Sequence, residues 1–285
     1  MAKGRALFIL SALFSLRAFA GPISTTPAPD YGQIGPLDQA AGRTAIAQFR
    51  QAGIPGSYYM EFALRFLPRR GEEQVVHGRL WGSRNEQGSV LKFVLNPGAA
   101  NERRWLLQVG PEPAAWSRDG RGATRSAQLL EPLWDHWEMT PFDLEMPMIA
   151  LYWPDETLLS VNRLFGRPAN AFLFRPPAAF AAQHPEIHAV RSYFDTEYDA
   201  PRQTELVGAN GRTLKTWICQ DLKKIAEIMV PKEFDVRNET TRDKTRLDVT
   251  GAAMNLPRSP AFFEPARLAD ALDPQRPPGF VDFGD

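Results

Sequence analysis

Histidines, acids and a single cysteine are the residues of this sequence that could support catalysis or bind a metal. His184 and His188 lie four positions apart in the segment HPEIH. On a helix this spacing brings two imidazoles to one face, where they could hold zinc. Pro185 disturbs the helical turn between them, and the sequence offers no obvious third ligand. We therefore interpret the segment as a loop between strands and expect no bound metal.

A second polar group, residues 135–138 (DHWE), could supply acid–base catalysis, although the polar side of a helix would explain it equally well. A hydrolase would need His136, His184 or His188 beside a nucleophile, and no G-x-S-x-G motif, P-loop or dinucleotide fingerprint accompanies them. Cys219 is the only cysteine, which excludes an intramolecular disulfide, and its place in a strand favours a packing role. We expect a protein without catalytic activity or a cofactor.

The charge balance bears on nucleic-acid binding, and the first twenty residues bear on the cellular compartment. The chain has 33 Lys and Arg against 33 Asp and Glu, and this mixture does not favour nucleic-acid binding. Lys3 and Arg5 precede an apolar run at 6–16, and AFA at 18–20 matches a small-x-small cleavage site. The run is shorter than the roughly 20 residues that span a bilayer. We therefore expect export, cleavage after Ala20, a periplasmic location and no permanent membrane anchor.

The next part of the chain predicts a leader, one helix and a run of strands. Residues 21–36 are rich in Pro, Gly, Ser and Thr, which is typical of a flexible leader. From 37 to 52 apolar residues recur at three- and four-residue spacing, and Gly53 follows them, which predicts an amphipathic helix. The apolar period then changes to two. Antiparallel strands are expected at about 58–67, 74–82, 89–96, 103–110 and 114–118.

The middle of the chain, residues 124–153, loses this period and becomes dense in Leu, Met and Trp. We expect short helices at 126–130 and 141–150, with Asp143 near an N-terminus, where the helix dipole favours an acid, and Pro147 interrupting the second helix. Strands resume after it. They are expected at 158–164 and 169–174, and a loop rich in Pro and Ala leads from there to a second meander at 190–250.

Asn210-Gly211 is the clearest turn signal of the second meander, because a two-residue type I′ turn needs positive φ at both positions. In the strand that follows, Leu214, Thr216 and Ile218 share one face, and Lys215, Trp217 and Cys219 share the other. A sheet with one apolar face must cover it with protein or with a ligand. Few helices are predicted for this, which favours a curved sheet with room beneath a lid, and a fully packed core is the alternative.

Three segments of this chain resemble the bacterial outer-membrane lipoprotein-sorting proteins, in an uncharacterised branch of the LolA/LolB-like superfamily. They are the Leu- and Met-rich middle (MTPFDLEMPMIALYWP), the strand-turn-strand with Pro201-Arg202, Gly211 and Leu214-Lys215-Thr216, and the polar hairpin at 238–245. The resemblance covers residues 37–255. It implies an α+β, mainly antiparallel fold: an incomplete (half) β-barrel at 37–256 with an N-terminal helix and short lid helices. The Pro-rich tail at 257–285 lies outside the resemblance, and from its sequence we expect a short docked segment at 262–268 and a frayed end.

The resemblance also implies a function. It predicts a periplasmic carrier, or chaperone, that binds the acyl chains of a lipoprotein or lipid and moves them toward the outer membrane, with an inner-membrane export complex as a candidate partner. The alternative is an envelope scaffold with a filled core that docks on such a complex. The predicted lining consists of Phe62, Leu64, Phe66, Leu91, Phe93, Leu95, Trp105, Leu107, Phe172, Phe174, Leu214 and Ile218 from the sheet, with Leu144, Met148 and Leu151 from the lid.

Overall fold

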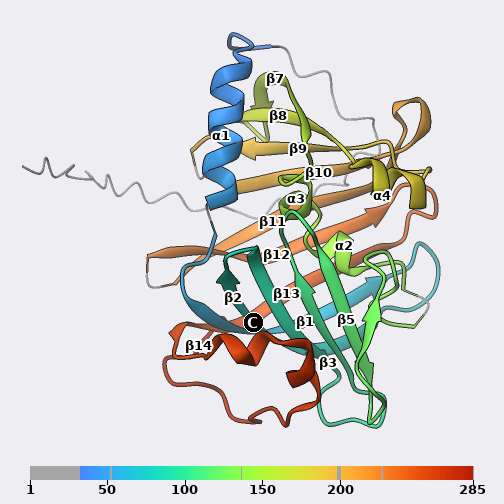
Figure 1. Cartoon of the computed structure of the whole chain (residues 1–285), viewed down its shortest axis with the longest axis vertical. Coiled ribbons are helices and arrows are strands. Elements are labelled where there is room, and N and C mark those ends of the chain that lie inside the picture. The colour runs from blue at the N-terminus through green and yellow to red at the C-terminus, as the bar shows by residue number, and fades with distance from the viewer. Residues whose placement is uncertain (1–32, 52, 136, 198–199, 226, 285) are drawn as a thin grey trace, which may run out of the picture. The chain divides into compact units, whose positions relative to one another are not determined.

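The computed structural model describes residues 33–51, 53–135, 137–197, 200–225 and 227–284. The expected export signal, its cleavage site after Ala20, most of the predicted leader and His136 lie outside these residues. Within the described residues, the backbone is organised around one antiparallel sheet of 14 strands (Figure 1). The mainly antiparallel fold class predicted from the sequence is confirmed.

The sheet consists of two meanders that share a central seam. The first comprises β1 (Ser57–Leu67), β2 (Gln74–Asn85), β3 (Gly88–Leu95), β4 (Arg103–Gln108), β5 (Ala114–Asp119) and β6 (Arg125–Ala127). The second comprises β7 (Asp155–Leu164), β8 (Arg167–Arg175), β9 (Ala189–Asp195), β10 (Ala200–Val207), β11 (Thr213–Ile225), β12 (Ile228–Asn238) and β13 (Lys244–Leu256). Because β13 pairs with β1, the order is β6-β5-β4-β3-β2-β1-β13-β12-β11-β10-β9-β8-β7, and β14 (Val281–Asp282) pairs with β13.

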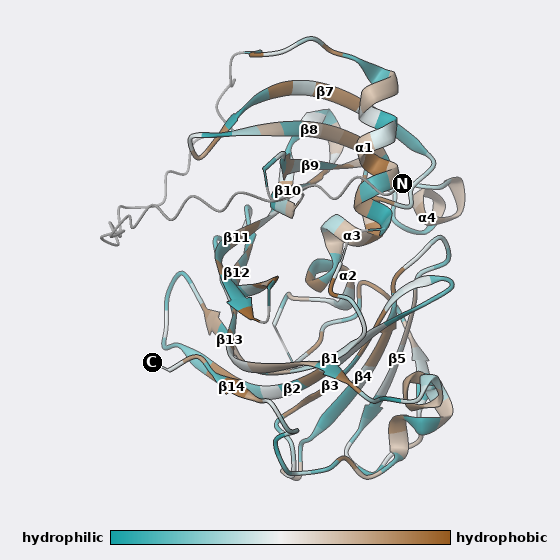
Figure 2. Ribbon diagram, turned by 90° about the vertical axis from the view of Figure 1, so that its left-hand side faces the viewer, coloured by the Kyte–Doolittle hydropathy of each residue, from teal (hydrophilic) through white to brown (hydrophobic). Residues whose placement is uncertain are grey.

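The sheet is bent but not closed. Its order ends at β6 on one side and β7 on the other, and Figure 2 shows the two meanders curving around a common inner side. In β2, Gly78 and Gly82 lie opposite Phe62 and Tyr58 of β1. A methyl group on either glycine would come within 2.2 Å or 2.0 Å of the facing ring, so the missing side chains make room for two aromatic rings on the inner face. The predicted incomplete half-barrel is confirmed.

Short helices lie on the inner side of the sheet. α1 (Gln39–Gln51) precedes β1, and α2 (Pro141–Leu144) and α3 (Met146–Ala150) belong to the crossover between β6 and β7. Figure 2 shows α2 and α3 within the bend of the sheet. α4 (Ala178–Gln183) joins β8 to β9. Among the described residues, no helix is both long enough and apolar enough to cross a membrane.

Local sequence explains α1 and the turn before β11. The α1 helix begins at Gln39, because the Asp38 carboxylate accepts hydrogen bonds from the backbone amides of Ala40 (2.9 Å) and Ala41 (3.1 Å). At the turn, φ is +57° at Asn210 and +72° at Gly211, as a type I′ turn requires. Both sequence-based predictions are confirmed.

The segment before α1 is part of the sheet edge. The backbone amide of Ile34 donates to the carbonyl of Val161 in β7 (2.8 Å). The Gln39 carboxamide exchanges two hydrogen bonds with the backbone of Leu158, at 2.8 Å and 3.0 Å. These contacts occupy backbone groups that an edge strand would otherwise leave unpaired. The end of the predicted flexible leader is therefore fixed on β7.

The helix predicted at 126–130 is wrong. Residues Arg125–Ala127 form β6, which pairs with β5 through Ala115↔Ala127 and Trp116↔Ser126. A free sheet edge offers backbone partners that a short amphipathic sequence cannot provide for itself, so tertiary pairing overrides local preference here.

The Pro-rich tail packs against the outer face of the first meander. Two 3₁₀ turns, Pro260–Phe263 and Pro265–Ala269, cover a second apolar cluster. The members of this cluster are Tyr59, Trp81, Val90, Val94, Leu106, Phe263 and Leu268. The docked segment predicted at 262–268 is confirmed. The frayed end is wrong, because Val281–Asp282 pairs with β13 as β14.

The buried side chain of Lys92, on β3, binds the backbone of this tail. This side chain is 1% exposed, and its ammonium donates to the backbone carbonyls of Phe262 (3.3 Å) and Arg267 (2.7 Å). The same ammonium lies 4.1 Å from the centre of the Phe262 ring. Burial lowers the Lys92 pKa to about 8. A buried amine is retained here because two carbonyls and an aromatic face replace its water.

Replacing Lys92 by Met should lower the free energy of unfolding by about 1–3 kcal/mol, because two partly buried carbonyls lose their donor while the side-chain volume is kept. Urea denaturation measures this change. The matched control is Arg79→Met, since Arg79 makes only a 3.4 Å exposed hydrogen bond to the tail carbonyl of Asp273. A Lys92→Met change no larger than the control would show that the ammonium does not hold the tail.

Candidate ligand-binding site

The inner face of the sheet and the crossover form one continuous apolar cluster. Alternate residues of each strand point inward, as the pleat requires. Phe62 (3% exposed) on β1 and Phe93 (2%) on β3 are typical members. Of the predicted lining, the buried members of this cluster are Phe62, Leu64, Phe66, Leu91, Phe93, Leu95, Trp105, Leu107, Leu144, Leu151, Phe172 and Phe174, with Met148 and Leu214 partly buried against it.

The predicted inward face of β11 is reversed around Ile218, although Leu214 of that face packs partly against the inner cluster. Trp217 and Cys219 belong to the inner cluster, whereas Ile218 lies between Gln203 of β10 and Asp235 of β12 on the opposite face. Both faces of β11 carry apolar and polar residues, so alternation alone could not orient the strand. The structure does not bring Ile218 together with the other predicted lining residues.

Aromatic side chains fill much of the space between the sheet and the crossover. Trp137 stacks on Phe66, with 5.5 Å between ring centroids, and its indole N–H donates to Gln74 Oε1 (3.2 Å). Phe142 of α2 packs against Trp153, with centroids 6.1 Å apart. The prediction had included only aliphatic residues from this segment. The density of Trp and Met at 133–153 was the signal for these additional core residues.

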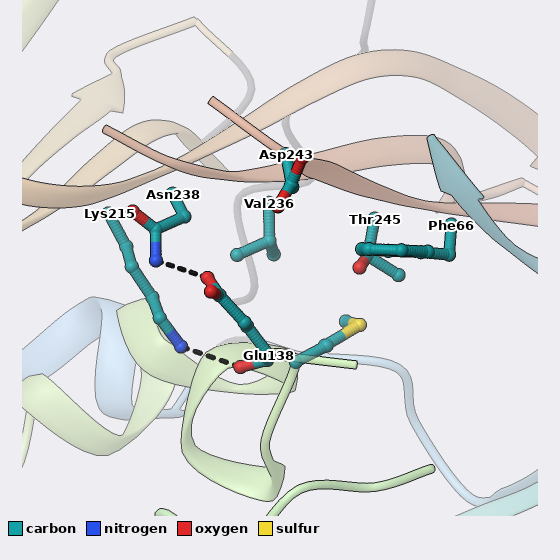
Figure 3. A pocket seen from close by; sticks show the side chains of 8 residues that line it. Phe66, Glu138, Lys215, Val236, Asn238, Asp243 and Thr245 are labelled. Carbon is teal, nitrogen blue, oxygen red and sulfur yellow. Dashed lines mark hydrogen bonds between the residues drawn. The ribbon is translucent and has the colours of Figure 1, made fainter. Parts of the chain in front are cut away.

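A polar latch attaches the crossover to β11 and β12 (Figure 3). The Lys215 ammonium lies 2.5 Å from Asp143 Oδ2. It also donates to the backbone carbonyl of Glu138 (2.7 Å), as Figure 3 shows. The Asn238 amide donates to the Glu138 carboxylate. We call these four residues, Glu138, Asp143, Lys215 and Asn238, the latch. Asp143 is fully buried, so its charge depends on Lys215 for compensation.

The sequence around Asp143 explains why α2 begins where it does. Thr140 is the N-cap: its hydroxyl accepts from the Asp143 amide (3.2 Å), and Asp143 Oδ2 accepts from the Thr140 amide (3.0 Å). Pro141 occupies the first turn, where its missing N–H costs nothing. The reciprocal pair is a capping box. The prediction that Asp143 lies near a helix N-terminus is confirmed, and its carboxylate also binds the sheet.

A shallow pocket lies beside the latch. It is lined by Phe66, Glu138, Met139, Lys215, Val236, Asn238, Asp243 and Thr245 (Figure 3). The space left within it is about 10 Å³, which is about enough for one water molecule. In this form of the protein, the pocket cannot hold an acyl chain.

Glu145 lies between α2 and α3. It ends the first helix and begins the second, without a side-chain cap hydrogen bond. Burial raises the pKa of its carboxyl to about 7, and the nearby carboxyl contributes to a raised pKa of the Tyr58 hydroxyl, where burial is the larger cause. An ionised carboxylate is poorly solvated at this position, so the closed crossover favours the protonated form.

The residues considered for catalysis are dispersed. His184 packs on the Phe180 ring, with 4.8 Å between centroids, while the His188 backbone amide donates to Val207 as β9 begins. Burial raises the Cys219 pKa to about 11, so its thiol is protonated at neutral pH and is a poor nucleophile. No group of three or more His, Cys, Asp or Glu that could hold a metal occurs in the described part of the chain.

Comparisons with known proteins found solved structures with a similar fold. A family model described as an uncharacterised protein matches residues 183–270, and no curated protein matches the chain. A DUF1329 family protein from Desulfovibrio piger is similar with a TM-score of 0.68 and 13% identity, covering 80% of this chain and 98% of its own.

Two further similar structures are described by names that refer to lipoprotein sorting or to the LolA superfamily. A putative outer membrane lipoprotein-sorting protein domain from Vibrio parahaemolyticus has a TM-score of 0.64 and 13% identity, covering 79% of this chain and 97% of its own. A LolA superfamily protein from Nitrosomonas europaea has a TM-score of 0.58 and 14% identity, covering 78% and 96%. The resemblance predicted from the sequence is confirmed at the level of the fold: this chain has the fold of the LolA superfamily.

Proposed function

We propose that this protein is an exported carrier that holds the acyl chains of a lipoprotein or lipid between the inner face of its sheet and the crossover. One observation supports the proposal above the others. Beside α1, the broad apolar face is covered by two helices of only four and five residues, which are attached to the sheet through a polar latch. Such a cover can be exchanged for a ligand.

The physical chemistry of an acyl chain explains why a carrier is needed. Each buried CH₂ group contributes about 0.8 kcal/mol, so one long chain exposed to water costs on the order of 10 kcal/mol. In the closed form the crossover supplies its own substitutes for this chain. Leu144, Met146 and Ile149 are buried against the sheet, and methionine adapts readily to new neighbours. Displacing these side chains would open space for acyl groups without leaving the sheet face in water.

Two further observations support a proposal for the compartment and for the direction of transport. The first twenty residues have the pattern of an export signal, and one structure with the same fold is described as an outer membrane lipoprotein-sorting protein domain. We therefore propose a periplasmic carrier that delivers its load toward the outer membrane. Its donor would be an export complex of the inner membrane.

An envelope scaffold without a ligand is the second candidate. The close packing of the inner cluster favours it, because the predicted lining residues already contact one another and the crossover. The two functions differ in one measurable respect. Mass spectrometry of organic extracts from protein purified out of the periplasm should detect a stoichiometric lipid for the carrier, and none for the scaffold.

Opening of the crossover can be measured without a ligand, because Cys219 is buried in the inner cluster. The double variant Lys215→Met/Asp143→Asn removes the ion pair and leaves an acceptor for the helix cap. It should increase the rate of Cys219 labelling by a maleimide roughly tenfold, since the crossover loses a buried pair without stranding a charge.

The matched control for this experiment is Arg191→Met/Glu205→Gln. Glu205 is also buried (3% exposed) and accepts a 2.8 Å hydrogen bond from Arg191, but the pair joins β9 to β10 on the face of the sheet opposite the inner cluster. Its labelling rate should stay near the wild-type value. Equal acceleration in both double variants would mean that general loss of stability, and not release of the latch, exposes Cys219.

The closed form should weaken as the pH rises through the titration of Glu145. The folded pKa of about 7 lies above the ordinary glutamate value of 4.5, so the stabilisation from the protonated carboxyl is complete below pH 4.5 and is lost above pH 7. Urea denaturation between pH 4.5 and 8 should show this decline relative to Glu145→Gln. Parallel pH profiles for the two proteins would contradict the assignment to Glu145.

A further inference from the structure

Two hydrogen-bond donors on the inner face of the first meander have no protein partner. They are the indole N–H of Trp105 on β4 and the hydroxyl of Ser117 on β5. The two residues are direct cross-strand neighbours, and they are 2% and 1% exposed. Neither polar atom has a hydrogen-bond partner among the described residues, so they do not bond to each other.

Several other polar side chains of the inner face are paired. Ser192 and Thr204 share a hydrogen bond of 2.8 Å between their hydroxyls, and the Trp137 indole donates to Gln74. A buried donor without a partner costs about 1–3 kcal/mol. Two such donors at adjacent positions therefore form a local polar site within an otherwise apolar surface.

The chemistry of the two groups defines what would satisfy them. An indole N–H can only donate, and a serine hydroxyl can donate or accept. Cross-strand neighbours have Cβ atoms about 4.5–5.5 Å apart, so one oxygen with two lone pairs can lie between their side chains. A hydrocarbon offers no such atom. A carbonyl oxygen offers both lone pairs and can be attached directly to an acyl chain.

We propose that Trp105 and Ser117 bind the ester or amide carbonyl of an acyl group, so that the carrier recognises acylated ligands and discriminates against plain hydrocarbons and alkyl ethers. This inference rests on the proposed carrier function and assigns the ligand's chemical class. The indole N–H of Trp217, on the inner face of the second meander, is also buried without a partner. It provides a third donor, which could bind another acyl carbonyl on the second meander.

Both donors are shielded from solvent in the closed form, so a ligand reaches them only after the crossover moves. The acyl chain then replaces the apolar side chains of the crossover, and its carbonyl replaces no existing hydrogen bond. Binding of the carbonyl therefore removes a desolvation cost that the closed form carries, without the loss of an internal partner.

The test compares ester-linked and ether-linked lipids with the same chains on delipidated full-length protein. One pair of probes is a diacyl phospholipid and its dialkyl ether analogue. The other is a synthetic diacylglyceryl lipopeptide and its dialkyl ether analogue. We expect the wild type to prefer each ester by about tenfold in dissociation constant, as one satisfied buried donor provides. The tighter ester identifies a phospholipid or a lipoprotein as the source.

The diagnostic variant is Trp105→Phe/Ser117→Ala. Phe preserves the stacking of residue 105 on Phe93, where the centroids are 6.4 Å apart, and Ala repeats the small residue at Ala115 on the same face. The variant should lose the ester preference and keep the ether affinity. Because it removes two unpaired donors, its melting temperature in the lipid-free state should equal or exceed that of the wild type.

Trp137→Phe is the control, since its donor is already paired with Gln74, and its ester preference should remain about tenfold. Equal affinity of the wild type for ester and ether overturns this inference and leaves the carrier function standing. An ester preference that persists in the double variant also overturns the assignment to Trp105 and Ser117. Failure to bind any of the four lipids contradicts both the carrier function and this inference.

Discussion

The structure depends on covering the apolar inner face of one wide, bent sheet. An antiparallel sheet can leave one face in water but must bury the other. Here the two meanders meet at β1 and β13, where Leu64 lies opposite Leu247, so one face runs through both of them. The cover consists of α1 and a crossover with two short helices. This arrangement concentrates the attachment of the cover in a few polar contacts, of which Lys215 with Asp143 is the most buried.

The outer face of the sheet differs between the first and the second meander. Over the first meander it is apolar and is covered by the tail, with Lys92 bonded to tail carbonyls. Over the second meander it is polar, and buried acids are compensated by ion pairs. Asp235 receives Arg246 Nε at 2.7 Å and Lys244 Nζ at 3.1 Å. The tail therefore completes the fold of the first half, and the inner face is the surface on which we propose that the cover is exchanged for a ligand.

Burial of the inner face stabilises the fold through its apolar area, but it also buries a few polar groups, which lowers the stability of the closed form. The carboxyl of Glu145 is protonated more readily than usual in the closed form, and the donors of Trp105 and Ser117 lack partners. Natural cores pair nearly all buried polar groups. Such costs reduce the free-energy difference between this closed form and the open form that the proposed carrier function requires.

The sequence by itself determined α1, the alternation in β1 to β5, the short helices near Asp143 and the type I′ turn at Asn210, because helix caps, side-chain period and turn chemistry act between near neighbours. It did not determine which face of β11 is buried, since Ile218 and Trp217 are both apolar. Only the tertiary structure placed Arg125–Ala127 on a sheet edge, docked the tail and joined Lys215 to Asp143. These contacts link segments far apart in the chain, 72 residues in the last case, and local patterns carry no information about such partners.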